Sequence, residues 1–140
     1  MNEKEETRFV RSFIRKDRQE RLLYELTTPE KRYRGVSRFC HRAGELLDRR
    51  TILLQGEDLD RRPEFRRFVE RHDAPCLVLS PDFDPDEQWL PLKAAVDRAV
   101  FCCDAVLILG NDFAVVFGEP DKGGREKYLL SETAEKTDPL

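Results

Sequence analysis

The stretch AVLILGNDFAVVF, residues 105–117, holds two apolar runs separated by Gly110-Asn111-Asp112. Apolar runs of four or five residues bounded by turn residues are typical of buried β-strands. The connection between the runs is too short for a helical crossover, so we expect the two strands to pair antiparallel. A further run, Lys127-Tyr128-Leu129-Leu130, follows a loop with Gly123-Gly124 and is predicted to complete an antiparallel meander.

Two earlier runs, Thr51–Gln55 and Cys76–Ser80, are also apolar at most positions. Strands that are apolar on both faces are typical of a parallel sheet covered by helices. The segments between the runs contain predicted helices at Pro63–His72 and Pro91–Phe101, and each is long enough for a crossover connection. We therefore expect the first three strands to be parallel.

The region before these strands has a helical pattern. One helix is predicted from about Glu3 to Leu26, and a second, opening near Pro29, runs to about Arg49. The sequence thus predicts a single α/β domain over residues 1–140, with a helical pair at 1–49 and a flexible tail at 131–140. The expected element order is α-α-β-α-β-α-β-β-β, around a mixed five-stranded sheet.

The composition excludes several classes of protein. Of the 140 residues 39% are apolar, and nine are Phe, which argues against a disordered chain. The longest apolar run is far too short to cross a bilayer, and no membrane association is expected. The charged start, Met1–Glu6, lacks the apolar segment of a secretory signal, so we expect a cytoplasmic protein. The four cysteines form no Cys-x-x-Cys pair and are expected to be free thiols.

Acidic residues follow each of the three predicted parallel strands: Glu57, Asp82 and Asp112. In a parallel sheet, ligands bind beyond the carboxyl ends of the strands. Carboxylates that converge there could hold a divalent cation such as Mg²⁺ or act as general acid and base. The competing interpretation is that these short polar side chains cap helices and turns, and on that reading no metal site is expected.

Charge is unevenly distributed along the chain. Residues 1–72 carry 19 Lys and Arg against 14 Asp and Glu, whereas residues 73–140 carry 6 against 14. This asymmetry suggests a charged partner or the meeting of two copies. Arginines recur every three or four residues on both N-terminal helices, and such stripes can follow phosphates. Acidic residues at helical spacing, as in Asp17 and Arg21, favour a solvated face instead. The candidate binding residues are Arg8, Arg11, Arg15, Arg18, Arg34, Arg38 and Arg42.

The segment Cys103-Asp104-Ala105-Val106-Leu107-Ile108-Leu109 follows a predicted helix. It resembles the core strand of TIR-type and nucleoside deoxyribosyltransferase-like domains, over residues 51–112. The resemblance implies a catalytic Glu on a helix after this strand. In this chain Glu119 follows a predicted hairpin strand, and we do not infer membership of these families.

No catalytic motif is present, so the leading hypothesis is a protein-binding or self-associating module without catalytic activity. The first alternative is a small enzyme that acts on a nucleotide or a phosphorylated small molecule through Glu57, Asp82 and Asp112. Mg²⁺ is expected only under that alternative, and otherwise no cofactor is expected. The second alternative is an RNA-binding module that uses the arginine stripes, although the net charge of −3 argues against nucleic acid.

Overall fold

A computed structural model describes residues 3–80, 88–101, 105–118 and 124–132. The helices are α1 (Glu3–Phe13), α2 (Gln19–Thr27), α3 (Pro29–His41), α4 (Ala43–Leu46), α5 (Pro63–Arg71) and α6 (Leu92–Phe101). The strands are β1 (Ile52–Gln55), β2 (Pro75–Leu79), β3 (Gln88–Pro91), β4 (Val106–Leu109), β5 (Phe113–Phe117) and β6 (Lys127–Ser131). Short 3₁₀ turns cover Lys16–Arg18, Arg49–Thr51 and Leu59–Arg61.

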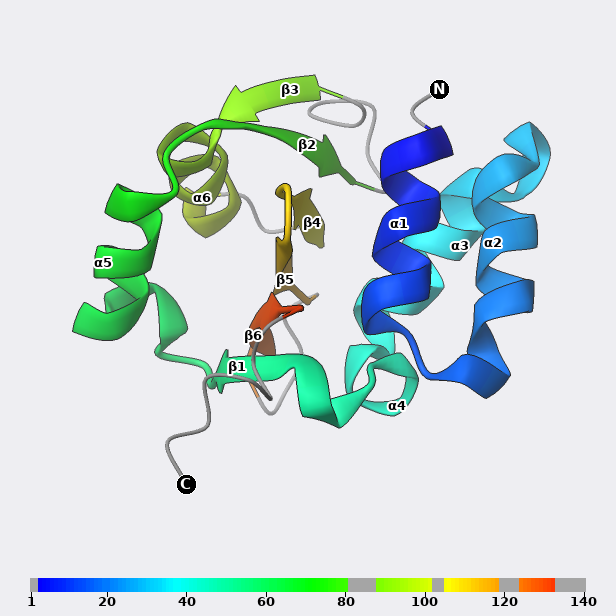
Figure 1. Cartoon of the computed structure of the whole chain (residues 1–140), viewed down its shortest axis with the longest axis horizontal. Helices are drawn as coiled ribbons and strands as arrows, with labels where there is room; N and C mark the ends of the chain where they lie inside the picture. The colour runs from blue at the N-terminus through cyan, green and yellow to red at the C-terminus, as the bar shows by residue number, and fades with distance from the viewer. Residues whose placement is uncertain (1–2, 81–87, 102–104, 119–123, 133–140) are drawn as a thin grey trace.

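The sheet lies between two layers of helices, with α1 to α4 on one side and α5 and α6 on the other (Figure 1). Its described strands number six, in the order β1-β6-β5-β4-β2-β3, and every neighbouring pair is antiparallel. The prediction of a mixed five-stranded α/β sheet is therefore wrong, and the fold is α+β. The antiparallel arrangement expected for β4, β5 and β6 is confirmed.

The sequence interpretation missed β3, and this omission reversed the predicted direction of β4. Strand β3 folds back on β2, with Leu77 opposite Trp89. Helix α6 then returns the chain, so that β4 enters beside β2 from the opposite direction, with Leu77 opposite Leu109. A signal for β3 was present, because Pro91 favours an extended conformation at Leu90, the residue before it.

Strands β1 and β2 do point in the same direction, because four antiparallel pairings separate them along the sheet. They are not neighbours, since β6, β5 and β4 lie between them. The apolar character of β2 does not come from parallel pairing. Helices cover both faces of the sheet, so successive side chains of β2 are buried whichever way they point.

The N-terminal region contains four helices rather than the predicted pair. Helix α1 ends where Ile14 forms an isolated antiparallel bridge with Leu47. Beside this bridge the Arg15 amide donates to the Leu46 carbonyl at 2.9 Å, and the Asp48 amide donates to the Phe13 carbonyl at 2.8 Å. These long-range hydrogen bonds replace the helical ones that the local pattern predicted.

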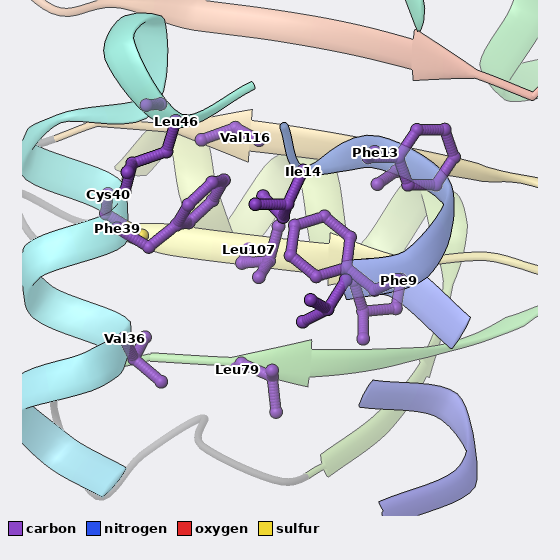
Figure 2. Close-up of a cluster of buried hydrophobic side chains, with 14 of the residues drawn as sticks. Phe9, Phe13, Ile14, Val36, Phe39, Cys40, Leu46, Leu79, Leu107 and Val116 are labelled. Atoms are coloured by element: carbon purple, nitrogen blue, oxygen red, sulfur yellow. The ribbon is translucent and has the colours of Figure 1, made fainter. Parts of the chain in front are cut away.

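The side chains of the N-terminal layer pack on one face of the sheet (Figure 2). Phe9 of α1 and Phe39 of α3 meet edge to face, with ring centroids 5.3 Å apart. The same cluster includes Leu79, Leu107 and Val116, one from each of three strands. The opposite face of the sheet carries a second cluster, built around α5 and α6.

Cys40 and Cys76 are buried and stand outside any disulfide, as predicted, whereas Cys102 and Cys103 lie outside the described residues. Within the described ranges no helix is long and apolar enough to cross a membrane. The predicted tail from residue 131 overlaps β6, which includes Ser131, and residues 133–140 lie outside the described part.

Candidate functional site

The acidic strand ends do not form one site. The Glu57 carbonyl accepts a hydrogen bond from Lys127 Nζ at 2.7 Å, and Lys127 lies opposite Phe117 at one end of β5. Asp112 directly precedes Phe113 at the other end of β5. These two acids are therefore separated by about the length of β5, roughly 13 Å at the usual rise of a strand.

Asp82, the third acid of the predicted site, lies outside the described residues, as does Glu119. Within the described part of the chain no group of three His, Cys, Asp or Glu side chains could hold a metal ion. Strand β4 runs antiparallel to β2. The carboxyl end of β4, which precedes Asp112, therefore lies beside the amino end of β2 and not beside its carboxyl end. The antiparallel pairing thus removes the geometric basis of the acidic pocket.

The first predicted arginine stripe lies on α1 and in the turn between α1 and α2, and it is engaged with carboxylates of the chain itself. Arg8 contacts Glu132 at 3.5 Å, and Arg11 contacts Glu20 at 2.9 Å. Arg15 and Arg18 both contact Asp17, at 3.4 and 3.8 Å. These pairs are largely exposed and contribute little to stability, but they offset the positive charge of this face.

Asp17 was predicted to pair with Arg21 one helical turn later, and the structure differs. A 3₁₀ turn at Lys16–Arg18 precedes α2, so that Asp17 reaches Arg15 and Arg18 instead. Arg21 is exposed and forms no ion pair with the residues that the structure describes. Its charge is therefore available to a ligand.

The arginines of the second predicted stripe, Arg34, Arg38 and Arg42, lie in three different environments. Arg38 is mostly buried and forms an ion pair with Glu25 of α2. Arg42 caps the end of α3, is exposed and makes no ion pair in the described part of the chain. Arg34 is exposed and lines a pocket of about 300 Å³ between α2 and α3.

This α2–α3 pocket gathers positive charge from two helices. Lys31, Arg34 and Arg38 recur at i, i+3 and i+7, so they lie on one face of α3. Arg21, Tyr24 and Glu25 of α2 recur at i, i+3 and i+4 and line the opposite wall.

The buried pair of Glu25 and Arg38 forms the base of the pocket. Glu25 is only 9% exposed, and Arg38 compensates its charge. Arg21, Lys31 and Arg34 form no ion pair with described residues, so the pocket retains three uncompensated positive charges. Its aromatic wall is Tyr24, which is 56% exposed.

The described lining of the α2–α3 pocket contains no histidine, cysteine or serine, and it offers only cations, one phenol and one neutralised carboxylate. Such a set can hold an anion through its arginine and lysine side chains and can stack a ring on the phenol. Sequence reasoning selected Arg34 and Arg38 but missed Arg21, Lys31 and Tyr24, because only the antiparallel packing of α2 on α3 brings them together.

A second cavity, of about 260 Å³, lies between α1 and the turn that joins β4 to β5. Its walls combine aromatic side chains, among them Phe9, Trp89 and Phe113, with charged ones such as Lys4 and Glu5. At its rim Arg8 Nη1 donates to Asn111 Oδ1 at 3.2 Å, and the Ser12 hydroxyl donates to Glu132 at 2.6 Å. These polar side chains are satisfied by one another, so they hold α1 against the sheet.

Comparisons of the chain with models of protein families, with characterised proteins and with solved structures find no significant match. The resemblance to TIR-type and nucleoside deoxyribosyltransferase-like domains thus gains no support. The functional interpretation rests on the geometry of the molecule.

Proposed function

We propose that this protein binds a small phosphorylated ligand that carries a ring, in the α2–α3 pocket. The observation that carries the proposal is the set of three uncompensated cations, Arg21, Lys31 and Arg34, on the wall of one pocket. The phosphate would lie against these cations, and the ring would stack on Tyr24. The ligand is of the class expected under the enzyme alternative, a phosphorylated small molecule, but we propose that the protein binds it without catalysing a reaction.

Phosphate suits the pocket better than a carboxylate because of its charge. A phosphomonoester carries nearly two negative charges at neutral pH and offers three acceptor oxygens. Arginine donates to such oxygens through two parallel N–H groups, and lysine adds a compact charge. Three cations from two helices can therefore surround one phosphate, whereas a single carboxylate would leave much of the positive charge uncompensated.

Tyr24 supports a ligand with a planar ring. Its side chain is 56% exposed beside Arg21 and Glu25. An exposed aromatic ring next to cations is the combination that binds a base by stacking and a phosphate by charge. The volume of about 300 Å³ lies at the lower end of the range for small-molecule sites.

A long nucleic acid fits the surface less well than a small ligand. Arg8, Arg11, Arg15 and Arg18 are paired with carboxylates, so the basic surface does not continue along α1. The net charge of −3 also disfavours a polyanion. The α2–α3 pocket instead brings cations from two helices to one small cavity.

Isothermal titration with AMP, ribose 5-phosphate and adenosine tests the proposal. AMP is expected to bind most tightly, ribose 5-phosphate more weakly, and adenosine weakest of the three. Arg34→Gln and Lys31→Gln should each weaken AMP binding about tenfold, because each removes a charge-assisted hydrogen bond of about 1.5 kcal/mol or more. Tyr24→Ala should abolish the difference between AMP and ribose 5-phosphate.

Arg42→Gln is the matched control, because it removes the same charge from an exposed position outside the pocket. It should leave AMP binding within twofold of the unchanged protein. Absence of AMP binding at millimolar concentration would refute the proposal, as would an equal loss in Arg42→Gln. Binding of poly(U) without binding of AMP would favour the RNA-binding alternative instead.

A further inference from the structure

The cavity between α1 and the turn from β4 to β5 shares no lining residue with the α2–α3 pocket, so it is a separate place for a ligand. Four aromatic side chains line it, and we call it the aromatic cavity: Phe9, Phe13, Trp89 and Phe113. Three of them are almost fully buried, whereas Trp89 is 49% exposed and therefore stands at the opening. The cavity thus joins an apolar interior to the surface.

The aromatic walls are held in place by the fold. The ring of Phe113 packs edge to face on Phe68, with centroids 5.0 Å apart, and lies over Gly110, where a Cβ atom would come within 2.2 Å of the ring. Phe9 and Phe13 lie side by side on α1, with ring centroids 5.8 Å apart (Figure 2). A ligand that enters would not have to order these rings, and such preorganisation favours binding.

The rim of the aromatic cavity carries both compensated and uncompensated charges. Arg8 is compensated, because it contacts Glu132 at 3.5 Å and donates to Asn111 at 3.2 Å. Lys4 and Glu5, on the first turn of α1, also line the cavity. Neither side chain forms an ion pair or a hydrogen bond with the residues that the structure describes. The rim therefore offers one positive and one negative charge to a ligand.

We infer that the aromatic cavity binds a free aromatic amino acid, such as phenylalanine. The ring of the ligand would lie among the aromatic walls, since aromatic rings favour edge-to-face and offset contacts with one another. Its carboxylate would face Lys4, and its ammonium group would face Glu5. The cavity of about 260 Å³ is slightly smaller than the roughly 300–1,000 Å³ of sites for drug-sized ligands, so it suits one ring with few further atoms.

The two rim charges select a ligand that carries both signs. An anion with a ring would pair with Lys4 but place a like charge beside Glu5. A cation with a ring would pair with Glu5 but place a like charge beside Lys4. Because a charge that a ligand shields from water is costly unless it is paired, each of these ligands leaves one unfavourable contact. An amino acid compensates both charges at once.

The fluorescence of Trp89 measures binding at this cavity directly, because Trp89 is the single tryptophan of the chain. Titration with L-phenylalanine is expected to shift its emission to shorter wavelength and to saturate. Phenethylamine, which lacks the carboxylate, and 3-phenylpropionate, which lacks the ammonium group, should each bind about tenfold more weakly, since each loses one charge-assisted hydrogen bond. L-Leucine, which lacks the ring, should also bind more weakly.

Two charge variants assign the ends of the ligand. Lys4→Gln should remove the advantage of phenylalanine over phenethylamine and keep its advantage over 3-phenylpropionate. Glu5→Gln should do the reverse. Lys16→Gln and Glu3→Gln are the matched controls, because they remove the same charges from exposed positions outside the cavity, and both should bind phenylalanine within twofold of the unchanged protein.

Three results would overturn the inference. One is the absence of a saturable change in Trp89 fluorescence with phenylalanine at millimolar concentration. Another is a loss in Lys16→Gln or Glu3→Gln equal to that in Lys4→Gln or Glu5→Gln. The third is equal binding of N-acetyl-L-phenylalaninamide, which has neither charge and would reassign the cavity to an aromatic side chain of a partner protein. AMP binding in the α2–α3 pocket is measured separately, so neither proposal depends on the other.

Discussion

Gly35 of α3 lies directly against Glu25 of α2, so closely that a Cβ atom at position 35 would come within 2.9 Å of the Cβ of Glu25. The close approach lets Arg38, on the next turn of α3, reach the buried carboxylate of Glu25. The close packing of α2 against α3, and with it the base of the α2–α3 pocket, therefore depends on the absence of a side chain at position 35.

Gly35→Ala should test this dependence. Alanine favours a helix over glycine by about 1 kcal/mol, whereas overpacking against a neighbouring backbone costs about 1–3 kcal/mol. We expect a net loss of about 1 kcal/mol in the free energy of unfolding, measured by urea denaturation, and weaker AMP binding. A gain of stability equal to the helix propensity would show that α3 can shift without cost.

The buried pair of Glu6 and Arg32 joins α1 to α3. Glu6 is 1% exposed, and its two oxygens accept from Arg32 at 2.5 and 2.9 Å. Glu6→Ala should lower the free energy of unfolding by about 3 kcal/mol, because it leaves a guanidinium buried without its carboxylate.

The double variant Glu6→Leu with Arg32→Met should recover most of that loss, since apolar side chains of similar size have no charge to desolvate. Glu20→Ala is the comparison for an exposed pair, because the Glu20 side chain is 82% exposed and contacts Arg11. Its effect should stay below about 1 kcal/mol. Equal effects for Glu6→Ala and Glu20→Ala in thermal and urea unfolding would contradict the assigned burial.

Asp60 should contribute to acid sensitivity. Burial raises its pKa, but the hydrogen bond from Lys127 Nζ at 2.7 Å and the nearby positive charges hold the pKa below the usual 3.8. A carboxyl with a lower pKa in the folded state stabilises the fold above its unfolded pKa. That contribution is lost as pH falls below about 4, through the folded pKa.

Asp60→Asn should therefore be less stable than the unchanged chain at pH 7 by about 1–3 kcal/mol, and the difference should shrink below pH 4. Asp58→Asn, in the same turn, is the matched control and should stay within about 0.5 kcal/mol at both pH values. Urea unfolding at pH 7 and pH 3 measures both effects. A difference that stays constant between the two pH values would rule out the titration of Asp60 as its cause.

Cys76 should be chemically inert in the folded protein. Burial, together with the negative charge of Asp73, raises the pKa of its thiol to about 11. At pH 8 about one thiol in a thousand is then ionised, against roughly a quarter for an ordinary cysteine. Iodoacetamide labelling followed by peptide mass spectrometry should modify Cys76 in denaturant but not in buffer. Rapid labelling in buffer would show that β2 opens readily.

The sequence identified every described strand except β3, together with the helices α5 and α6, because each of these elements has a clear local pattern. It also identified the meander of β4, β5 and β6, because the connection between β4 and β5 is too short for a crossover and requires antiparallel pairing. It failed on the direction of β4 relative to β2. A local pattern reports burial on both faces, and helices on both sides of an antiparallel sheet produce the same pattern as a parallel one.

The candidate site was less predictable than the fold. Arg34 and Arg38 stood out because they recur at helical spacing, although Arg38 proves to be paired with Glu25. The same rule selected Arg8, Arg11, Arg15 and Arg18, which the structure also pairs with carboxylates. Periodicity places a side chain on a face of its own helix. It does not indicate which neighbouring helix supplies a compensating charge, so free and paired arginines look alike.

By itself, the amino-acid sequence determined where most strands and helices form, since hydrophobic period, proline and turn residues act over a few neighbours. Only the tertiary structure decided that Glu57 and Asp112 lie apart, that β1 is an edge, and that Arg21, Lys31 and Arg34 share one pocket. These are contacts between residues distant along the chain, and they depend on strand order and helix packing, which no local pattern encodes.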